Sequence, residues 1–536
     1  MAAGIESLFD GAALILPLAS TPLFLLGVLL LRGSASLRRL VGSDAFIGAA
    51  LVAGALVGLL FAGQVATYLA YPGFPDHVQT TIAKMAFLLY RGQDLYPPPG
   101  GPAIYGMPYG PSLFLLDGIG TGLDPSNTGA KIPAVAALVL GLFGLLAALR
   151  ATLDGRQATL LTLLAVMLLL PYGLFAYWNR PEPFLFSAAA LAFAALRLRP
   201  VGAAVAIGLL LGLAAGIKLH GFLYLAPAAA ALIGQRPGMR AGVTSLLTMG
   251  LAALAAFAAP FLLPNVSVAG YARDFAMAAG HGLDRVMLLT SLELAAAILA
   301  PALLLYVSHR PPIDAADRWL FWGLLAAATG VVLVAGRVQA GAYHVLALIP
   351  ACLYTAARLA TGRPSGRALP VGPANLWAFG LLLALVAFWP GLLRNYGGIS
   401  TVELLDDRAV MGEAMNELHD YAERYPGAQM AVSDDDRYWL AMQDAPLVFR
   451  SGRLVIDYAS WMDLVFIGAG RDGLVRFVED CPVPAWVMPE GGGPFTLHSL
   501  YDGASLFTDE FRRRFLDEYR EAESGRFYRV WICRKG

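Results

Sequence analysis

Long apolar runs alternate with short charged breaks over the first three quarters of the chain. A helix that crosses a bilayer needs roughly 20 apolar residues. About a dozen runs approach or exceed that length, at 11–31, 45–70, 128–150, 157–177, 183–197, 201–217, 221–234, 241–263, 286–308, 318–336, 343–360 and 373–392. The pattern predicts an all-α polytopic membrane domain over residues 1–393, with about 12 transmembrane helices.

One loop of this body, at residues 71–127, is longer than the rest. Its segment HVQTTIAKMAFLLYR has apolar residues at helical spacing and predicts an amphipathic helix at the membrane interface. A later piece, SLFLLDGIGTGL, is too short to cross a bilayer. We expect it to be re-entrant or interfacial.

In residues 394–536, segments with the two-residue hydrophobic period of strands alternate with segments that have the helical period. The segments QMAVSD, PLVFRSG, AWVMPE and RFYRVWIC predict strands, and RYWLAMQ, DGLVRFVED and DEFRRRFLDEYREAE predict helices. A soluble α/β domain is the natural arrangement of such elements.

Composition supports this division of the chain. Hydrophobic residues make up 58% and charged residues 14%, against about 25% charged in soluble domains. The tail from residue 394 carries 16 of the 38 basic and 24 of the 38 acidic side chains, so the membrane body is positive and the tail negative. These values exclude a cytosolic enzyme, a disordered protein and a secreted disulfide scaffold, and three cysteines are too few for a cysteine-rich metal site.

The charges also predict the orientation of the chain. Most body arginines fall in one set of short loops, which the positive-inside rule places in the cytoplasm. The N-terminus and the tail then lie on the outer face. In an oxidising compartment we expect Cys481 and Cys533, next to two predicted strands, to form a disulfide, the alternative being two separate thiols.

Polar side chains gather at the outer ends of the predicted spans. Because charges near a bilayer are costly, such groups usually line a cavity or pair with one another. They are Asp76, His77, Asn179, Arg180, Glu182, Lys218, His220, His281, Asp284, Arg285, Arg337, Gln339, Tyr343 and His344.

Simpler roles exist for several of these residues. Asp76 precedes the amphipathic helix and could cap its N-terminus. Arg180 and Glu182 could form a surface salt bridge, and Lys218 could extend toward lipid headgroups.

The order of these motifs resembles the GT-C membrane glycosyltransferases. The resemblance rests on an acidic residue after an early span, a helix ending RGQDLY, the turn YGMPYGPSL, and the later segments NRPEPFLFSAAALAFAAL, GLLLGLAAGIKLHGFLYLAPAAAAL and AYHVLALIPACLYTAARL. It implies the GT-C fold, a bacterial inner membrane location with a periplasmic tail, and inverting transfer of a hexose or pentose from a polyprenyl-phosphate donor to a glycan, lipid or protein acceptor.

The resemblance also implies roles for individual residues. Asp76 would be the catalytic base, and Arg337, His344 and Lys218 would bind the donor phosphate. The residues expected to contact substrate are His77, Tyr105, Tyr109, Arg180, Glu182, Gln339 and Tyr343. A carboxylate base with cations at the leaving phosphate needs no nucleotide or redox cofactor. Some relatives use a divalent metal, but no cluster of acids near Asp76 demands one, so we expect no cofactor and leave a divalent metal open.

Two departures from the family pattern bear on the substrate. His77 stands where many members have a second acid, and the turn lacks the Lys-Pro-Pro of the aminoarabinose and protein-mannosyl branches. The sequence is therefore most similar to the polyprenol-phosphate-mannose branch.

Two other classes of function remain open. A lipid or oligosaccharide flippase or transporter would place charges near mid-membrane and on both faces, whereas here they gather on one. A glycan polymerase or ligase would share the topology but usually has its largest loop late in the chain. Nucleic-acid binding is disfavoured by the acidic tail, and no nucleotide-binding or zinc-protease motif is present.

Overall fold

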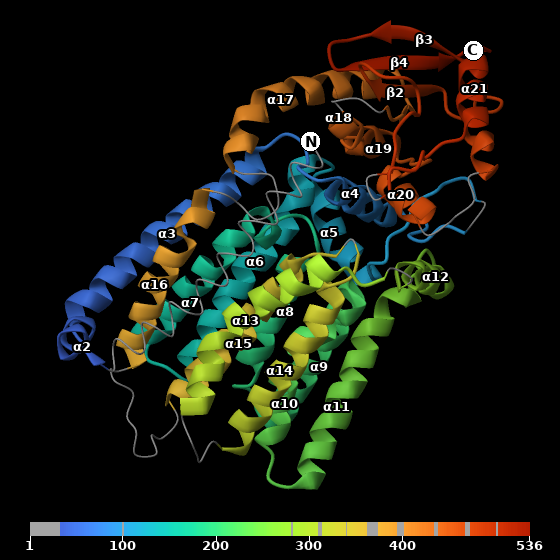
Figure 1. Ribbon diagram of the computed structural model, residues 1–536. Coiled ribbons are helices and arrows are strands. Elements are labelled where there is room, and N and C mark those ends of the chain that lie inside the picture. Colours follow the sequence, from blue (N-terminus) through green and yellow to red (C-terminus); the bar gives the residue numbers. More distant parts are fainter. Residues whose placement is uncertain are drawn as a thin grey trace. The chain divides into compact units, whose positions relative to one another are not determined.

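The computed structural model describes residues 33–98, 101–279, 282–308, 314–338, 340–361, 373–393, 401–433, 438–466, 472–499 and 502–535 (Figure 1). Their contacts divide the chain into two units. We call Met1–Ala66, Ala134–Ala259 and Gly282–Thr401 the helical unit, and Thr67–Pro133, Pro260–His281 and Val402–Gly536 the mixed unit. The predicted span at 11–31 lies outside the described residues. The predicted domain boundary at 393 adjoins residues 394–400, also outside them, and stays a prediction.

Apolar helices make up the helical unit. They are α2 (Ala35–Val41), most of α3 (Asp44–Ala70) and α6 (Asn127–Arg150), α7 (Gly155–Leu169), α8 (Pro181–Ala195), α9 (Pro200–Ile217), α10 (Phe222–Gly234), α11 (Met239–Ala258), α13 (Arg285–Ser308), α14 (Ala315–Ala335), α15 (Ile349–Thr361) and α16 (Pro373–Leu393). Every described run that the apolar pattern predicted coincides with one of these helices, alone or continued by a short 3₁₀-helix. The all-α polytopic class is confirmed.

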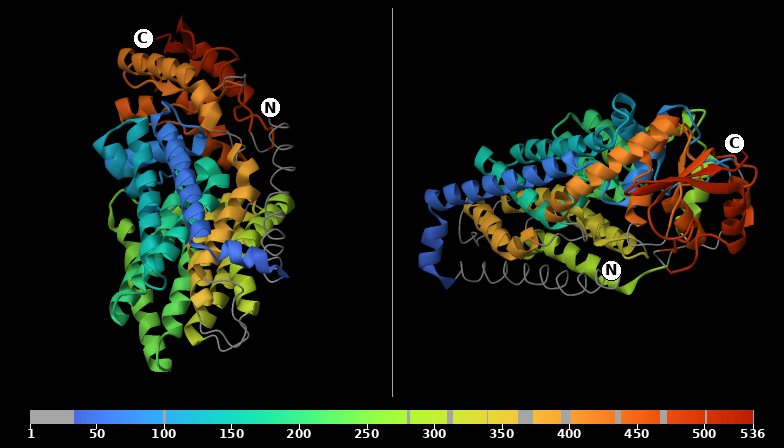
Figure 2. Two further views of the ribbon diagram at one scale, coloured as in Figure 1. Left: turned by 90° about the vertical axis from the view of Figure 1, so that its left-hand side faces the viewer. Right: turned by 90° about the horizontal axis from the view of Figure 1, so that it is seen from above.

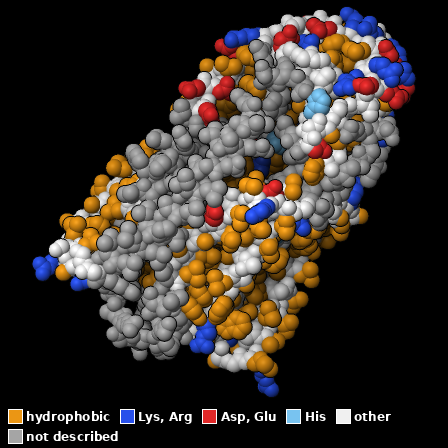
Figure 3. All heavy atoms as spheres, viewed as in Figure 1, with side chains coloured by type: hydrophobic (Ala, Val, Ile, Leu, Met, Phe, Trp, Pro, Cys, Tyr) orange, Lys and Arg blue, Asp and Glu red, His pale blue; other side chains and the backbone are white. Residues whose placement is uncertain are grey.

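Among the residues that the structure describes, seven helical segments are long and apolar enough to cross a bilayer. They are Asp44–Ala70, Asn127–Arg150, Pro200–Ile217, Met239–Leu262, Arg285–Leu303, Ala315–Ala335 and Ala342–Thr361. In the most apolar 18 residues of Met239–Leu262 only 17% are buried by the protein, whereas in those of Ala342–Thr361 89% are, so the second segment is packed on all sides by protein. Apolar side chains dominate the visible surface of these helices (Figure 3), as contact with lipid requires. The predicted number of about 12 spans stays a prediction.

Three 3₁₀-helices adjoin the ends of α-helices in the described part of this unit: one follows α7, and the others precede α10 and α15. These are η1 (Leu170–Ala176), η2 (Leu219–Gly221) and η4 (Ala342–Leu348). Within η1, Gly173 has φ 52° and ψ −124°, a conformation that strongly favours glycine. Backbone that leaves the α-helix at membrane depth is tolerated where protein or a cavity surrounds it. All three 3₁₀-helices adjoin the polar residues singled out above.

The mixed unit combines short helices with one sheet. Its helices are α4 (His77–Tyr90), α5 (Pro111–Leu123), α12 (Val268–Ala279), α17 (Thr401–Arg424), α18 (Tyr438–Ala441), α19 (Ala445–Ser451), α20 (Tyr458–Phe466), η5 (Asp472–Phe477) and α21 (Asp509–Glu518). Its strands are β1 (Gln429–Met430), β2 (Ala485–Pro489), β3 (Tyr519–Ser524) and β4 (Tyr528–Cys533). The order is β1-β2-β4-β3, with β1 parallel to β2 and the other pairs antiparallel. Figure 1 labels β2, β3 and β4, and the dark red strands of Figure 2 are β3 and β4.

Two predictions for the tail are wrong. The segment PLVFRSG was predicted as a strand but forms α19, with proline in its first turn and Gly452 at φ 64° ending it. The predicted helix DEFRRRFLDEYREAE ends at Glu518, because the following residues pair with β4 as β3. The strands β2 and β4 and the disulfide between Cys481 and Cys533 are confirmed.

Candidate active site

Asp76 is the N-cap of α4 in the mixed unit. Its Oδ2 accepts hydrogen bonds from the backbone amides of Val78 (3.0 Å) and Gln79 (3.3 Å). Its Oδ1 lies 3.5 Å from Nδ1 of His77, and both side chains are about one-fifth exposed. The simpler capping role is therefore present, and it leaves Oδ1 on the side of the imidazole.

The loop that leads into Asp76 is held by side chains from two other helices. Lys131 of α6 donates to the carbonyls of Tyr68 (3.1 Å) and Tyr71 (2.6 Å), which satisfies acceptors at the C-terminus of α3. Asn127 donates to the carbonyl of Pro72 at 2.9 Å. The Tyr71 hydroxyl donates to Asp407 of α17 at 2.9 Å. The backbone before Asp76 is thus fixed from several directions.

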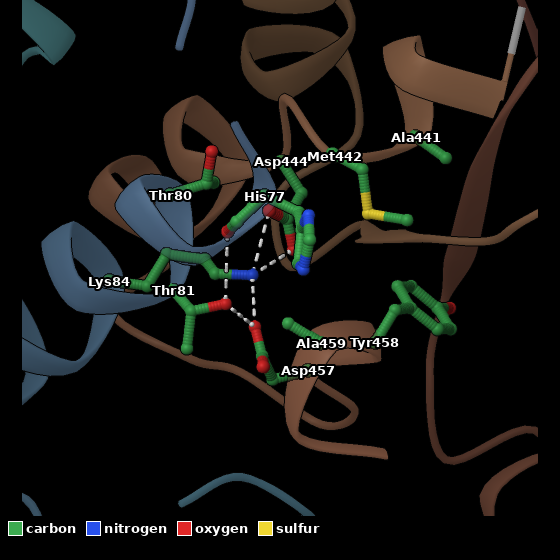
Figure 4. A pocket seen from close by; sticks show the side chains of 10 residues that line it. All are labelled: His77, Thr80, Thr81, Lys84, Ala441, Met442, Asp444, Asp457, Tyr458 and Ala459. Carbon is green, nitrogen blue, oxygen red and sulfur yellow. Dashed lines mark hydrogen bonds and ion pairs between the residues drawn. The ribbon is translucent and has the colours of Figure 1, made fainter. Parts of the chain in front are cut away.

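About two turns after the cap on α4, Lys84 lies between two buried carboxylates. Its Nζ is 2.7 Å from both oxygens of Asp444 and 2.7 Å from Oδ1 of Asp457 (Figure 4). Thr81 donates to Asp457 Oδ1 at 2.8 Å, and the Ser460 amide and hydroxyl donate to its Oδ2 at 2.8 and 2.6 Å. We call Lys84, Asp444 and Asp457 the buried triad.

The triad residues titrate differently because their surroundings differ. Burial would lower the pKa of Lys84, but the two carboxylates raise it above its usual value. Burial, together with the negative charge of Asp457, raises the pKa of Asp444 despite the nearby lysine. Burial would likewise raise the pKa of Asp457, but Lys84 and the Ser460 donors hold it below its usual value. Asp457 is therefore the firmly ionised partner.

A small polar cavity opens beside the triad. It is lined by His77, Thr80, Thr81, Lys84, Ala441, Met442, Asp444, Asp457, Tyr458 and Ala459. Figure 4 shows the triad and Thr81 pointing toward one another, with His77 beside them. The accessible space is about 10 Å³, room for roughly one water molecule.

Two of the three tyrosines predicted to bind substrate, Tyr105 and Tyr109, lie in the same unit as the triad and are buried. The Tyr105 hydroxyl donates to the carbonyl of Asp94 at 2.8 Å, and burial with the nearby Asp94 charge raises its pKa to about 12. The carbonyl of Tyr109 accepts from Tyr96 at 2.7 Å. These two hydrogen bonds tie residues 105–109 to residues 94–96 and so fix the conformation of the loop between α4 and α5.

A second polar cluster lies in the helical unit, in and next to η1, η2 and η4. Lys218 Nζ is 3.4 Å from Glu182 Oε1 and 2.8 Å from His344 Nε2. His344 Nδ1 is 2.8 Å from the carbonyl of Gly341, which can only accept, so Nδ1 carries the hydrogen and Nε2 accepts from Lys218. His344 is accordingly a neutral imidazole that orients the ammonium group. Trp178 donates to the other oxygen of Glu182 at 3.1 Å.

Two further cations join this cluster. Arg180 lies over the Trp178 ring at 4.0 Å. It is close enough to Lys218 and His344 for its charge to interact with both. His220 stacks on His344 at 5.4 Å and lies within electrostatic range of both Lys218 and Arg337. We call Arg180, Lys218 and Arg337 the cation cluster. With Glu182 as the acidic residue that contacts it, the charge is predominantly positive.

An aromatic wall borders the cation cluster. Tyr343 stacks on Phe175 at 4.9 Å and contacts Trp178 edge-on at 5.7 Å. Lys218 lies 5.9 Å from the centre of the Tyr343 ring. Positive charge beside aromatic faces suits an anionic ligand that carries an apolar chain.

The structure therefore gathers part of the predicted site in each unit. Arg180, Glu182, Lys218, Tyr343 and His344 lie together, with Arg337 near His220. Asp76, His77, Tyr105 and Tyr109 belong to the mixed unit, and Gln339 and His281 fall outside the described residues. Within the described ranges, no group of three or more His, Cys, Asp or Glu side chains could hold a metal ion.

Sequence reasoning missed the buried triad. Lys84 interrupts the apolar stretch of its helix, which is a signal for a buried, paired charge. The acidic partners gave no such signal, because aspartates in a charged tail are normally solvated.

No family model matches the sequence, and no curated protein matches it. The fold is similar to that of ArnT from Cupriavidus metallidurans. The apo structure shares 14% identity over 90% of this chain and 98% of ArnT, with a TM-score of 0.53. The structure bound to undecaprenyl phosphate shares 12% identity over 91% and 98%, with a TM-score of 0.55. The chain therefore shares the fold of ArnT, which is the GT-C fold that the resemblance implied, with a small sheet near its C-terminus.

Proposed function

We propose that this protein transfers a hexose or pentose from a polyprenyl-phosphate donor to a glycan or glycolipid acceptor, with inversion, on the periplasmic face of a bacterial inner membrane. The observation that carries the proposal is the cation cluster, in which Arg180 is buried and Lys218 and Arg337 are partly buried, beside an aromatic wall. The GT-C fold supports it, since ArnT of that fold binds undecaprenyl phosphate.

The residues divide the chemistry between them. Lys218, Arg337 and Arg180 bind the donor phosphate and stabilise the charge that develops on it as the sugar leaves. His344 and Glu182 contact the ammonium group of Lys218 and orient it toward the phosphate. The Asp76 carboxylate accepts the proton of the acceptor hydroxyl as that oxygen attacks the anomeric carbon. His77, Tyr105, Tyr109, Gln339 and Tyr343 are proposed to contact the sugars.

Sidedness belongs to the same proposal. The arginine-rich loops support a periplasmic tail, on the side where polyprenyl-linked sugars and envelope acceptors meet. The disulfide between Cys481 and Cys533 is consistent with an oxidising compartment.

The test begins with the product. Mass spectrometry compares envelope glycolipids of a strain lacking the gene with those of the complemented strain. The purified protein is then given undecaprenyl-phosphate mannose, glucose, galactose or arabinose with lipid extract from the deletion strain. We expect one donor to restore the missing species. If the wild-type protein consumes none of them, the proposed function is wrong.

Two variants separate catalysis from binding. Asp76→Asn removes the base and should slow transfer roughly 10²–10⁴-fold, while titration with undecaprenyl phosphate gives unchanged affinity. Lys218→Met should weaken that affinity, because a phosphate bound away from water loses a counter-charge. Transfer by Asp76→Asn at the wild-type rate would reduce Asp76 to a helix cap.

A further inference from the structure

Gln443, in the turn between α18 and α19, pairs with the loop that presents Asp76. Its Oε1 accepts from the amide of Phe74 at 2.8 Å, and its Nε2 donates to the carbonyl of Phe74 at 2.8 Å. The side-chain amide thus satisfies both polar groups of one residue, as a neighbouring strand would. Gln443 is 3% exposed, so water does not compete for these bonds.

The loop has little freedom to move away from this contact. Phe74 is 2% exposed and packs in a cluster with Ala83, Ala130 and Ala445. A Cβ on Gly73 would lie 2.7 Å from Gln443 Oε1, so the backbone approaches the glutamine as closely as only glycine allows.

Asp444, the next residue of the tail, binds the chain on the C-terminal side of Asp76. Asp444 holds Lys84 of α4 with both carboxylate oxygens. Adjacent residues of the tail therefore hold Phe74 before the carboxylate and Lys84 after it. The hydrogen bonds of Gln443 fix the backbone just before the cap.

We propose that Gln443 is a positioning residue that sets the reactive geometry of Asp76. The proposal rests on the proposed function, in which Asp76 is the base. A base must reach the acceptor hydroxyl to within about 2.6–3.2 Å. Displacement of about 1 Å can cost roughly 10²-fold in rate. A loop released from Gln443 keeps the carboxylate but loses that precision.

The test compares two glutamine variants. Gln443→Met keeps the length of the side chain and removes both hydrogen bonds. The matched control is Gln429→Met, since Gln429 is also 3% exposed, accepts from the amide of Val455 (2.9 Å) and donates to the carbonyl of Arg453 (3.2 Å). Transfer is measured with the undecaprenyl-phosphate sugar that the wild-type protein consumes.

For Gln443→Met we expect the rate at saturating donor to fall roughly 10–10²-fold, with a half-saturating donor concentration within twofold of wild type. Hydrogen exchange should rise in peptides covering residues 71–78. The control should change neither quantity. If Gln443 only stabilised the fold, both variants would have a lower thermal midpoint. Gln443→Met would then not show a lower rate at saturating donor together with an unchanged half-saturating concentration.

Parallel measurements keep the outcomes distinct. If Asp76→Asn is inactive and Gln443→Met transfers at the wild-type rate, the positioning role is wrong while the proposed function stands. If Asp76→Asn keeps the wild-type rate, the base assignment fails instead. Should Gln443→Met not fold, Gln443→Glu retains the acceptor for the Phe74 amide and is expected to show the same split to a smaller degree. Wild-type kinetics for that variant would overturn the proposal.

Discussion

Replacing Lys84 with Met tests the energetics of the buried triad directly. The three side chains are 1–4% exposed, and Lys84 is the cation that neutralises the two carboxylates. Removing one partner of a buried ion pair costs about 3–5 kcal/mol, because an uncompensated charge stays behind. For a unit of about 200 residues, this lowers the unfolding midpoint by roughly 10 °C. Thermal unfolding in detergent, followed by tryptophan fluorescence, measures the change.

Two comparisons make the test specific. Lys535 also contacts two carboxylates, Asp480 at 3.1 Å and Glu518 at 2.9 Å, but its side chain is 58% exposed. Lys535→Met should leave the midpoint almost unchanged, because exposed ion pairs contribute little. The double variant Lys84→Met with Asp444→Met should be more stable than Lys84→Met alone, since Thr81 and Ser460 still satisfy Asp457.

The pH dependence of the loss follows from the same charges. Asp444 already has a raised pKa, and removal of the lysine raises it further, so acid protonates this carboxyl in the folded variant. The deficit of Lys84→Met relative to wild type should shrink as the pH falls from 8 toward about 5. A deficit that is constant over this range, or a double variant less stable than the single one, would refute the reasoning.

Three other predictions follow from the described contacts. Burial raises the pKa of Asp274 from 3.8 to about 6 although Arg273 opposes it, so the folded state binds the proton more tightly than the unfolded state and stability falls as the pH rises from 3.8 through 6. Asp274→Asn should therefore stabilise the protein at pH 8 by up to about 3 kcal/mol and much less at pH 4.5, as unfolding curves at both values would show. Replacing Cys481 and Cys533 with Ser should cost about 2–5 kcal/mol, and reducing agent should lower the midpoint of the wild type but not of this variant. Alkaline phosphatase fused to the C-terminus should be active and a green fluorescent fusion dark; the reverse pattern contradicts the proposed sidedness.

The membrane helices could be predicted from the sequence because lipid imposes a local requirement. Each span must be apolar over its own length, so runs such as 128–150 and 286–308 mark their helices to within a few residues. The tail obeys no such rule. Residues 519–524 continue a helical pattern but become β3, because β4 offers hydrogen-bond partners that the local sequence does not reveal.

The same distinction explains which site residues could be found. Lys218 and His344 stand out because polar groups in apolar segments need partners, and the structure pairs them with each other. Asp76 is found as an N-cap, as the simpler interpretation of its position allowed, and its proposed role as the base rests on the resemblance. Gln443 and Asp444 could not be found, because nothing near them in the chain marks a contact with Phe74 or Lys84.

Residues that contact one another in the mixed unit are far apart in the sequence, and this determines when during synthesis the unit can assemble. Lys84 and Asp444 are 360 residues apart. At a synthesis rate of about 5–20 residues per second, Lys84 emerges roughly 20–70 s before its partner. During that interval the lysine has neither of its carboxylates, and the loop before Asp76 lacks Gln443. The mixed unit is therefore completed only after residues 402–536 have been synthesised. A chain that stops before residue 443 cannot build the surroundings of Asp76, however well its membrane helices insert.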